Sequence, residues 1–140
     1  MQSIPRSPEH NDNEAISPTD RDQALLVQRA KQLRQHLAAM PESELPMTYQ
    51  ALALALALPT PHSIHRLVQA LELTMAEDAH AQRPFIAALV ISRARGGLPA
   101  PGFFDLAARL GRHDGAESGA AAAQFHLQQM KQVLALRRQA

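Results

Sequence analysis

The sequence predicts a small, mostly α-helical domain: a winged helix-turn-helix-like fold with an additional C-terminal helix. Three observations support this fold class. The composition is 46% hydrophobic but only 4% aromatic, so the core must be rich in Ala and Leu, which are strong helix formers. Two helical segments flank a proline turn at residues 59–61. A short apolar run, residues 85–92, supplies the β-strand of the winged variant, and the glycine-rich loop that follows it supplies the wing.

Composition and charge limit the function classes. The chain has 140 residues, which fits one domain. Its formal net charge of +1 is too small to indicate nucleic-acid binding by itself. The absence of cysteine excludes disulfides, thiolate zinc sites and a cysteine nucleophile. The N-terminus lacks the apolar segment of a signal peptide, and the longest apolar run, residues 51–58, is too short to cross a membrane. We therefore expect a cytoplasmic protein with no membrane contact.

The chain divides into four predicted parts. Residues 1–18 carry three prolines among polar residues and are expected to form a disordered N-terminal tail. Residues 19–112 form the helical, winged-helix-like domain. Residues 113–119 form a linker, and residues 120–140 form a C-terminal amphipathic helix.

The first predicted helix begins at Thr19 or Asp20, either of which can cap it, and ends before Pro41. Its apolar positions form an approximate helical stripe. The other face is either simply solvated or contacts phosphate. That face carries Arg29, Lys31, Arg34 and Gln35.

The helix-turn-helix comes next. Thr48 is a good N-cap for a short helix over residues 49–58. Ala and Leu alternate strictly over residues 51–58, which is a strand pattern, but their poor β propensity and the threonine cap favour a helix. The second helix begins just after the proline turn and continues to about His80.

The segment beyond this pair contains the predicted strand and wing. Residues 85–92 are bounded by a proline and by Arg-Ala-Arg-Gly-Gly, which indicates a strand. Phe103 and Phe104 are expected to pin the following loop to the core. A short helix over residues 105–110 then ends at Gly111, because glycine suits a helix C-terminus.

The start of the second helix is the candidate DNA-binding site. In a helix-turn-helix this end enters the major groove and offers its outward residues to base edges. Arg66 has the fork geometry for guanine, and Gln69 has the amide that pairs with adenine. Arg93 and Arg95 flank the predicted wing and are expected to hold phosphates. The predicted DNA-binding residues are therefore His62, Ser63, His65, Arg66, Gln69, Arg93 and Arg95.

Three segments carry a resemblance to a known family: MTYQALALALAL, HSIHRLVQAL and RPFIAALVISRARGGLPAPGF. Over roughly residues 46–111 the chain resembles the C-terminal DNA-binding half of the alkylguanine-DNA alkyltransferase family and its alkyltransferase-like relatives. There a Thr/Ser-Tyr-x-x-[LIV]-A helix leads to a recognition helix, and residues 48–53 match that start. The family's Pro-Cys-His-Arg is missing, since the strand reads Ala-Leu-Val-Ile-Ser-Arg, so alkyl transfer does not carry over. The resemblance implies a winged-helix shape, with the family's base-stack arginine falling near His65 or Arg66.

No residues assemble a recognisable catalytic centre or cofactor site. His62 and His65 are spaced for two metal ligands on one helix face, but no third ligand stands nearby, so exposed helix histidines are the simpler interpretation. Ser63 is better explained as a helix N-cap than as a nucleophile. Glu77 and Asp78 are adjacent, point to different sides of a helix and make a poor acid/base pair. We expect no enzyme, no cofactor and no metal.

The leading hypothesis is a non-enzymatic DNA-binding or regulatory protein that binds double-stranded DNA. The alternative is a protein-interaction adaptor or small structural domain. It would act through the C-terminal helix and the Phe103/Phe104 loop, on a protein partner or on a second copy of itself. A third hypothesis is an enzyme whose pocket the sequence does not reveal.

Overall fold

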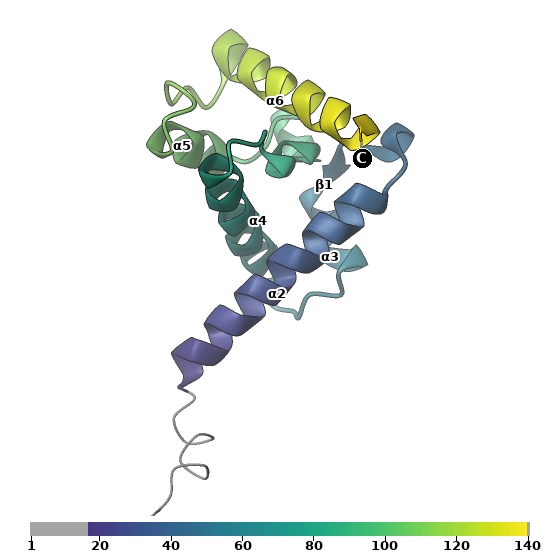
Figure 1. Ribbon diagram of the computed structural model, residues 1–140, viewed down its shortest axis with the longest axis vertical. Coiled ribbons are helices and arrows are strands. Elements are labelled where there is room, and N and C mark those ends of the chain that lie inside the picture. The colour runs from purple at the N-terminus through teal and green to yellow at the C-terminus, as the bar shows by residue number, and fades with distance from the viewer. Residues whose placement is uncertain (1–16, 140) are drawn as a thin grey trace, which may run out of the picture.

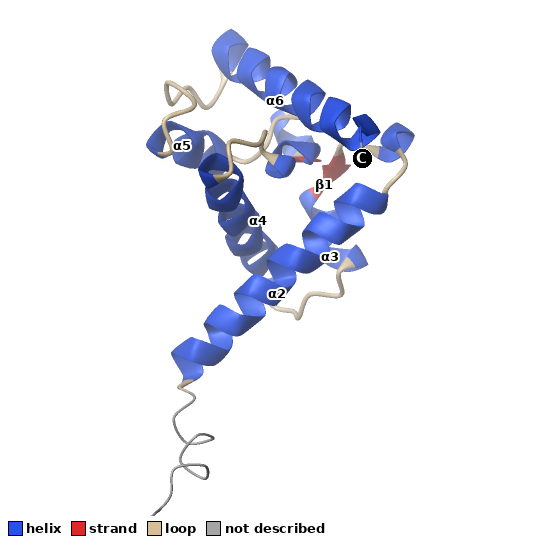
Figure 2. Ribbon diagram, viewed as in Figure 1, coloured by secondary structure: helices blue, strands red, loops and turns tan. Residues whose placement is uncertain are grey.

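The computed structural model describes residues 17–139, and residues 1–16 of the predicted tail lie outside the described residues. Within the described chain the fold is mostly helical, as predicted (Figures 1 and 2). Helix α2 crosses α4, and α6 lies across the far side of the fold from the start of α2 (Figure 1). The described α-helices are α2 (Pro18–Ala39), α3 (Tyr49–Ala55), α4 (Ser63–His80), α5 (Pro101–Arg109) and α6 (Gly119–Gln139). None of the described helices is long and apolar enough to span a bilayer.

Short elements connect these helices. Two strands of two residues each form a small parallel sheet, in which Met47 lies opposite Val90. The short elements are the 3-10 helices η1 (Glu42–Glu44), η2 (Ile86–Leu89) and η3 (Arg93–Arg95) and the strands β1 (Met47–Thr48) and β2 (Val90–Ile91).

Hydroxyl side chains cap α2 and α3. The Ser17 Oγ accepts a hydrogen bond from the Asp20 N–H at 3.1 Å, so the cap of α2 lies before the predicted Thr19 or Asp20. The Thr48 Oγ1 accepts a hydrogen bond from the Ala51 N–H, also at 3.1 Å. This confirms the predicted start of α3, because a side-chain oxygen here satisfies an amide that has no partner within the helix.

The predicted strand over residues 85–92 is wrong for most of its length. Residues 86–89 form η2, and the strand β2 covers only Val90–Ile91. The segment is almost wholly buried, and a short buried apolar run looks the same in a strand and in a tight helical turn. The loop that follows is closed by a single antiparallel bridge between Ser92 and Leu98, while β2 itself pairs in parallel with β1.

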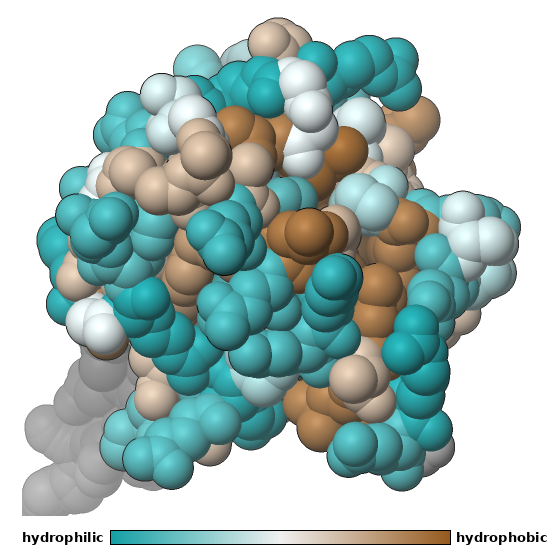
Figure 3. All heavy atoms as spheres, turned by 90° about the horizontal axis from the view of Figure 1, so that it is seen from above, coloured by the Kyte–Doolittle hydropathy of each residue, from teal (hydrophilic) through white to brown (hydrophobic). Residues whose placement is uncertain are grey.

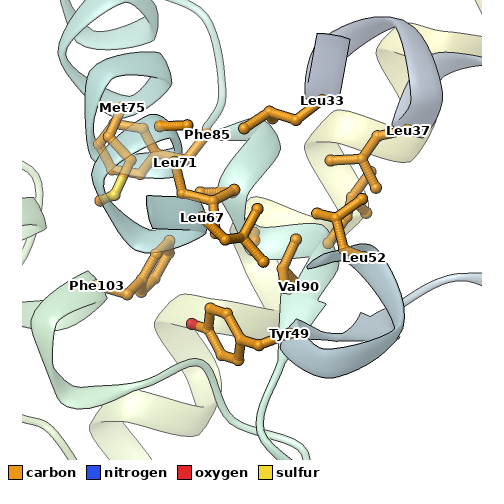
Figure 4. Close-up of a cluster of buried hydrophobic side chains, with 14 of the residues drawn as sticks. Leu33, Leu37, Tyr49, Leu52, Leu67, Leu71, Met75, Phe85, Val90 and Phe103 are labelled. Carbon is orange, nitrogen blue, oxygen red and sulfur yellow. The ribbon is translucent and has the colours of Figure 1, made fainter. Parts of the chain in front are cut away.

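One hydrophobic core joins all five described helices. Leu33 of α2 and Leu67 of α4 are fully buried and converge with Val90 of β2 (Figure 4). Tyr49 of α3 lies at the edge of this cluster, where its hydroxyl accepts a hydrogen bond from the Ala100 N–H at 2.8 Å. Burial raises the pKa of Tyr49 above its usual value. Tyr49 therefore anchors the loop before α5 to the core.

Phe103 and Phe104 are buried in this core. They are 6% and 0% exposed and pack edge to face, with ring centroids 5.1 Å apart. They anchor this segment to the core as expected, but from α5, which begins at Pro101 and not at the predicted residue 105. Their burial corrects the expectation that the segment is a contact surface, because neither side chain is available to a partner. Phe125 of α6 packs against Phe103, so α6 belongs to the same core. From the side of α6, hydrophobic residues show in separate patches among hydrophilic ones (Figure 3).

A buried carboxylate, Asp78, joins α2 to the end of α4. It is 1% exposed. Its Oδ1 accepts hydrogen bonds from Arg34 of α2 at 2.8 Å and from Arg83 at 3.1 Å, and its Oδ2 accepts one from the Ile86 N–H at 3.0 Å. The same Arg34 guanidinium also pairs with Glu77 at 3.0 Å. The two adjacent carboxylates therefore share one cation, although they were expected to point to different sides of the helix.

Three helices end in the same backbone motif. A residue with positive φ follows the helix, and the next N–H bonds to a carbonyl five residues earlier. The positive-φ residues are Ala57 (52°), Gln82 (59°) and Gly111 (83°). The stop predicted at Gly111 is confirmed, and the motif at Ala57 ends α3 before the predicted residue 58. The three long bonds are Leu58 N–H to Ala53 O, Arg83 N–H to Asp78 O and Arg112 N–H to Ala107 O.

We expect the Asp78→Ala substitution to lower the free energy of unfolding by about 2–4 kcal/mol, because it removes three charge-assisted or buried hydrogen bonds. Glu77→Ala is the matched control. It removes a carboxylate that pairs with the same arginine at an exposed position, so its cost is below about 1 kcal/mol. Chemical denaturation followed by circular dichroism measures both values. Equal costs for the two variants would show that Asp78 has no special role.

Glycine at the two non-glycine helix ends should stabilise the fold. We expect Ala57→Gly and Gln82→Gly each to raise the free energy of unfolding by about 0.5–1 kcal/mol, since glycine adopts positive φ without steric cost. Gly111→Ala should have the opposite sign, although an added Cβ there meets no atom within 4 Å. Thermal denaturation of the three variants tests this. A higher melting temperature for the two glycine variants and a lower one for Gly111→Ala would indicate a backbone conformational effect, because a packing effect would not follow the sign of φ.

Candidate functional site

The turn between α3 and α4 is held by one arginine. Arg66, in the first turn of α4, donates hydrogen bonds to the carbonyls of Pro59 and Pro61. These bonds tie the turn to the helix that follows it. The predicted tight turn is therefore present, and the Arg66 guanidinium is directed at the protein backbone.

His62 begins α4 from a left-handed conformation, with φ 69° and no side-chain capping bond. The Arg66 N–H bonds to the His62 carbonyl at 3.0 Å, which starts the helical pattern one residue before Ser63. Ser63 is therefore the first residue of α4, and the expectation that it caps the helix is wrong. A non-glycine residue in this conformation costs roughly 1–2 kcal/mol, and such strain is found most often at functional positions.

A polar hollow of about 350 Å³ lies between the N-terminal parts of α2 and α4. Four residues come from α2, three come from α4, and His62 lies just before α4; the last four are all predicted DNA-binding residues. The lining includes two arginines, two histidines and one carboxylate, a balance that favours an anionic group. The lining residues are Asp22, Gln23, Leu26, Arg29, His62, His65, Arg66 and Gln69.

Three of the predicted residues, His62, His65 and Gln69, are exposed at this hollow. The contribution of α2 was not predicted as part of the same site. Arg29 had been placed on a basic helix face that either was solvated or contacted phosphate, and the structure puts its side chain beside the α4 residues. The sequence signal for Arg29 was present, but its position depends on how α2 crosses α4.

The two arginines of the predicted wing lie in different surroundings. Arg95 is half-buried, and its guanidinium donates hydrogen bonds to the carbonyls of Pro99, at 2.9 Å, and Glu117. Arg93 is exposed. It lines a second open hollow of about 470 Å³, separate from the one at α4. The other residues around this second hollow are Thr48, Gln50 and Ala94.

Sequence reasoning missed a buried histidine, His126 of α6. It is 5% exposed, and its Nε2 lies 2.8 Å from the Ala88 carbonyl oxygen. A carbonyl only accepts, so the neutral ring carries its proton on Nε2. Burial lowers the pKa of His126. The sequence signal that could have indicated this burial was the position of His126 next to Phe125, on the apolar side of the helix.

Two further findings concern metal binding and similarity to known proteins. Among residues 17–139, no three His, Cys, Asp or Glu side chains gather closely enough to hold a metal ion. No family model, curated protein or solved structure shows a significant match to this chain. The function therefore has to be inferred from the described residues themselves.

Burial of His126 predicts that the fold loses stability in acid. The unfolded chain binds a proton near the usual histidine pKa of about 6.5, while the folded chain resists it. The neutral, buried His126 therefore contributes fully to the free energy of unfolding above that pH. This contribution is lost as the pH falls toward the lowered pKa of the folded state, by up to about 1.4 kcal/mol per pH unit. Denaturation at several pH values, compared with His126→Gln, checks this. Glutamine can still donate to Ala88 but does not titrate, so an unchanged pH dependence in that variant would contradict the assignment.

Proposed function

We propose that this protein is a non-enzymatic DNA-binding protein that contacts double-stranded DNA with the N-terminal end of α4. The observation that carries the proposal is the hollow at that end, where exposed polar side chains of α4 meet Arg29 of α2. We propose a regulatory role for the same protein, by analogy with other DNA-binding proteins that use a helix-turn-helix.

The exposed residues would make the contacts. Gln69 carries an amide that can pair with the edge of an adenine. His62 and His65 can donate hydrogen bonds to phosphates or bases. Arg29 would hold a phosphate beside the groove, since a guanidinium matches phosphate geometry.

Two of the seven predicted residues take a different role in this proposal. Arg66 and Arg95 bond to backbone carbonyls, so we assign them to shaping the turn and the loop rather than to reading bases. Arg93 remains available for a phosphate contact. The loop from Ser92 to Leu98 would then act as a small wing that carries this arginine.

The resemblance to the alkylguanine-DNA alkyltransferase family supports the winged-helix shape that this proposal assumes more than any chemistry. It places a recognition helix where α4 lies, and Thr48 and Tyr49 stand at the start of the preceding helix as in the family motif. The chain contains no cysteine, so the proposal includes binding without alkyl transfer.

We expect salt-sensitive binding of weak affinity. A site with about three phosphate contacts should bind a duplex with a Kd on the order of 10 μM at low salt, and log K should fall by about 0.9 per contact for each tenfold rise in salt. Fluorescence anisotropy with a 20-base-pair duplex, at two salt concentrations, measures this. No salt-sensitive binding at protein concentrations up to about 100 μM, roughly ten times that Kd, would remove the proposal.

Substitutions locate the contact surface. Arg29→Ala, His65→Ala, Gln69→Ala and Arg93→Ala should each weaken binding about three- to tenfold at low salt, as lost phosphate or base contacts do. Arg109→Ala is the matched control, because Arg109 is an exposed arginine of α5 whose recorded partner is Asp105 one turn away. An equal loss for Arg109→Ala would mean that binding follows overall charge and not this site.

A further inference from the structure

The first turns of α2 form an arm that extends past the rest of the fold (Figure 1). Every residue from 18 to 28 is exposed except Leu26. Two of these exposed residues, Leu25 and Val27, are large aliphatic side chains that are 43% and 40% exposed. The later turns of the same helix pack on the core through Ala30, Leu33 and Leu37, whereas these first turns bury no side chain and would gain stability from a packing partner. The arm therefore has reason to gain a packing partner.

The arm carries a second residue stripe besides the one that faces the core. The core stripe contains Ala30, Leu33 and Leu37. The second stripe lies about a third of a turn away around the helix, and all four of its members are exposed. Within residues 17–139 no ion pair engages either of its charged members. The stripe consists of Asp20, Ala24, Val27 and Lys31.

This stripe is complementary to itself. Its spacing of four, three and four residues is symmetric about the midpoint between residues 25 and 26. An antiparallel copy would place Asp20 opposite Lys31 and Ala24 opposite Val27, and the same pairs would repeat at the other end. A parallel copy would place like charges against each other, which is unfavourable. Charge therefore selects the antiparallel arrangement.

We propose that two copies of this chain form a two-fold dimer by pairing their α2 arms antiparallel along this stripe. The small side chain of Ala24 lets the helices approach, and Val27 supplies the apolar contact between them. Ion pairs between Asp20 and Lys31 close both ends. The inference rests on α2 alone and does not depend on DNA binding.

The geometry of the fold permits this pairing. The core stripe of α2 faces the body of its own chain, and the second stripe lies on a flank of the helix where all four of its members are exposed. A helix pair of about three turns buries at most roughly 1,000 Å², which is at the low end for specific interfaces. The dimer should therefore be weak, with a Kd on the order of 10 μM.

Sedimentation equilibrium of the full chain, over a protein concentration range that spans that Kd, tests the proposal. We expect a reversible monomer–dimer equilibrium. Asp20→Lys and Lys31→Asp should each weaken it about tenfold, because each places like charges at both ends of the helix pair. An equal mixture of the two variants should restore the dimer, since every pair in the mixed dimer is again of opposite sign. Restoration also shows that neither variant has lost its fold.

Lys131→Asp is the matched control, because Lys131 is an exposed lysine of α6, and it should leave the equilibrium unchanged. A chain that stays monomeric throughout the concentration range overturns the proposal. So does a dimer that Lys131→Asp weakens while Lys31→Asp leaves it intact, because that places the interface on α6. Failure of the mixture to restore association overturns the antiparallel pairing.

Discussion

The arrangement of the helices depends on a buried charge that must be satisfied. Asp78 lies inside the protein, and an unpaired carboxylate there would cost far more than a small domain can tolerate. Its partners come from three parts of the chain: Arg34 on α2, Arg83 after α4 and the backbone of Ile86. These segments must therefore meet at one point. That requirement is a stronger restraint on how α2 crosses α4 than apolar contact alone, which is not directional.

The two ends of α4 are fixed by different arginines. Asp78 holds the C-terminal end through Arg34, and Arg66 holds the N-terminal end by bonding to the turn before it. About 18 Å of helix separates Arg66 from Asp78, at 1.5 Å per residue. The hollow at the start of α4 therefore sits on a helix that is fixed at both ends, so its polar side chains are presented by a rigid support. Such support is what a binding site needs for its geometry to be maintained.

Local signals predicted most of the secondary structure, and long-range contacts account for what they missed. The Thr48 cap, the turn at residues 59–61 and the stop at Gly111 each depend on a few neighbouring residues, and the structure contains all three. The run at residues 85–92 was misread because its conformation depends on Asp78 and α6, which contact it from distant parts of the chain.

At the candidate site, too, features that depend on local sequence were predicted and features that depend on long-range contacts were not. Exposure of His62, His65 and Gln69 followed from helical periodicity and is present in the structure. The internal role of Arg66 and the presence of Arg29 beside these residues did not follow, because each depends on a backbone path or a helix crossing that periodicity does not encode. Arginine is the residue type for which this error is easiest, since its long side chain reaches either solvent or a backbone carbonyl from the same Cα position.

The two proposals are physically complementary. Of the arginines predicted to contact DNA, Arg66 and Arg95 bond to backbone carbonyls, so under the proposed function a single site has few cations for phosphates and would bind DNA only weakly. Pairing two chains would place two such sites on one particle, and the second contact would then form at a high effective concentration. A weak site with a fixed shape gains more from this arrangement than a strongly basic one. A strongly basic surface already binds any duplex by charge, whereas two shaped sites at a fixed separation respond to the spacing of their targets.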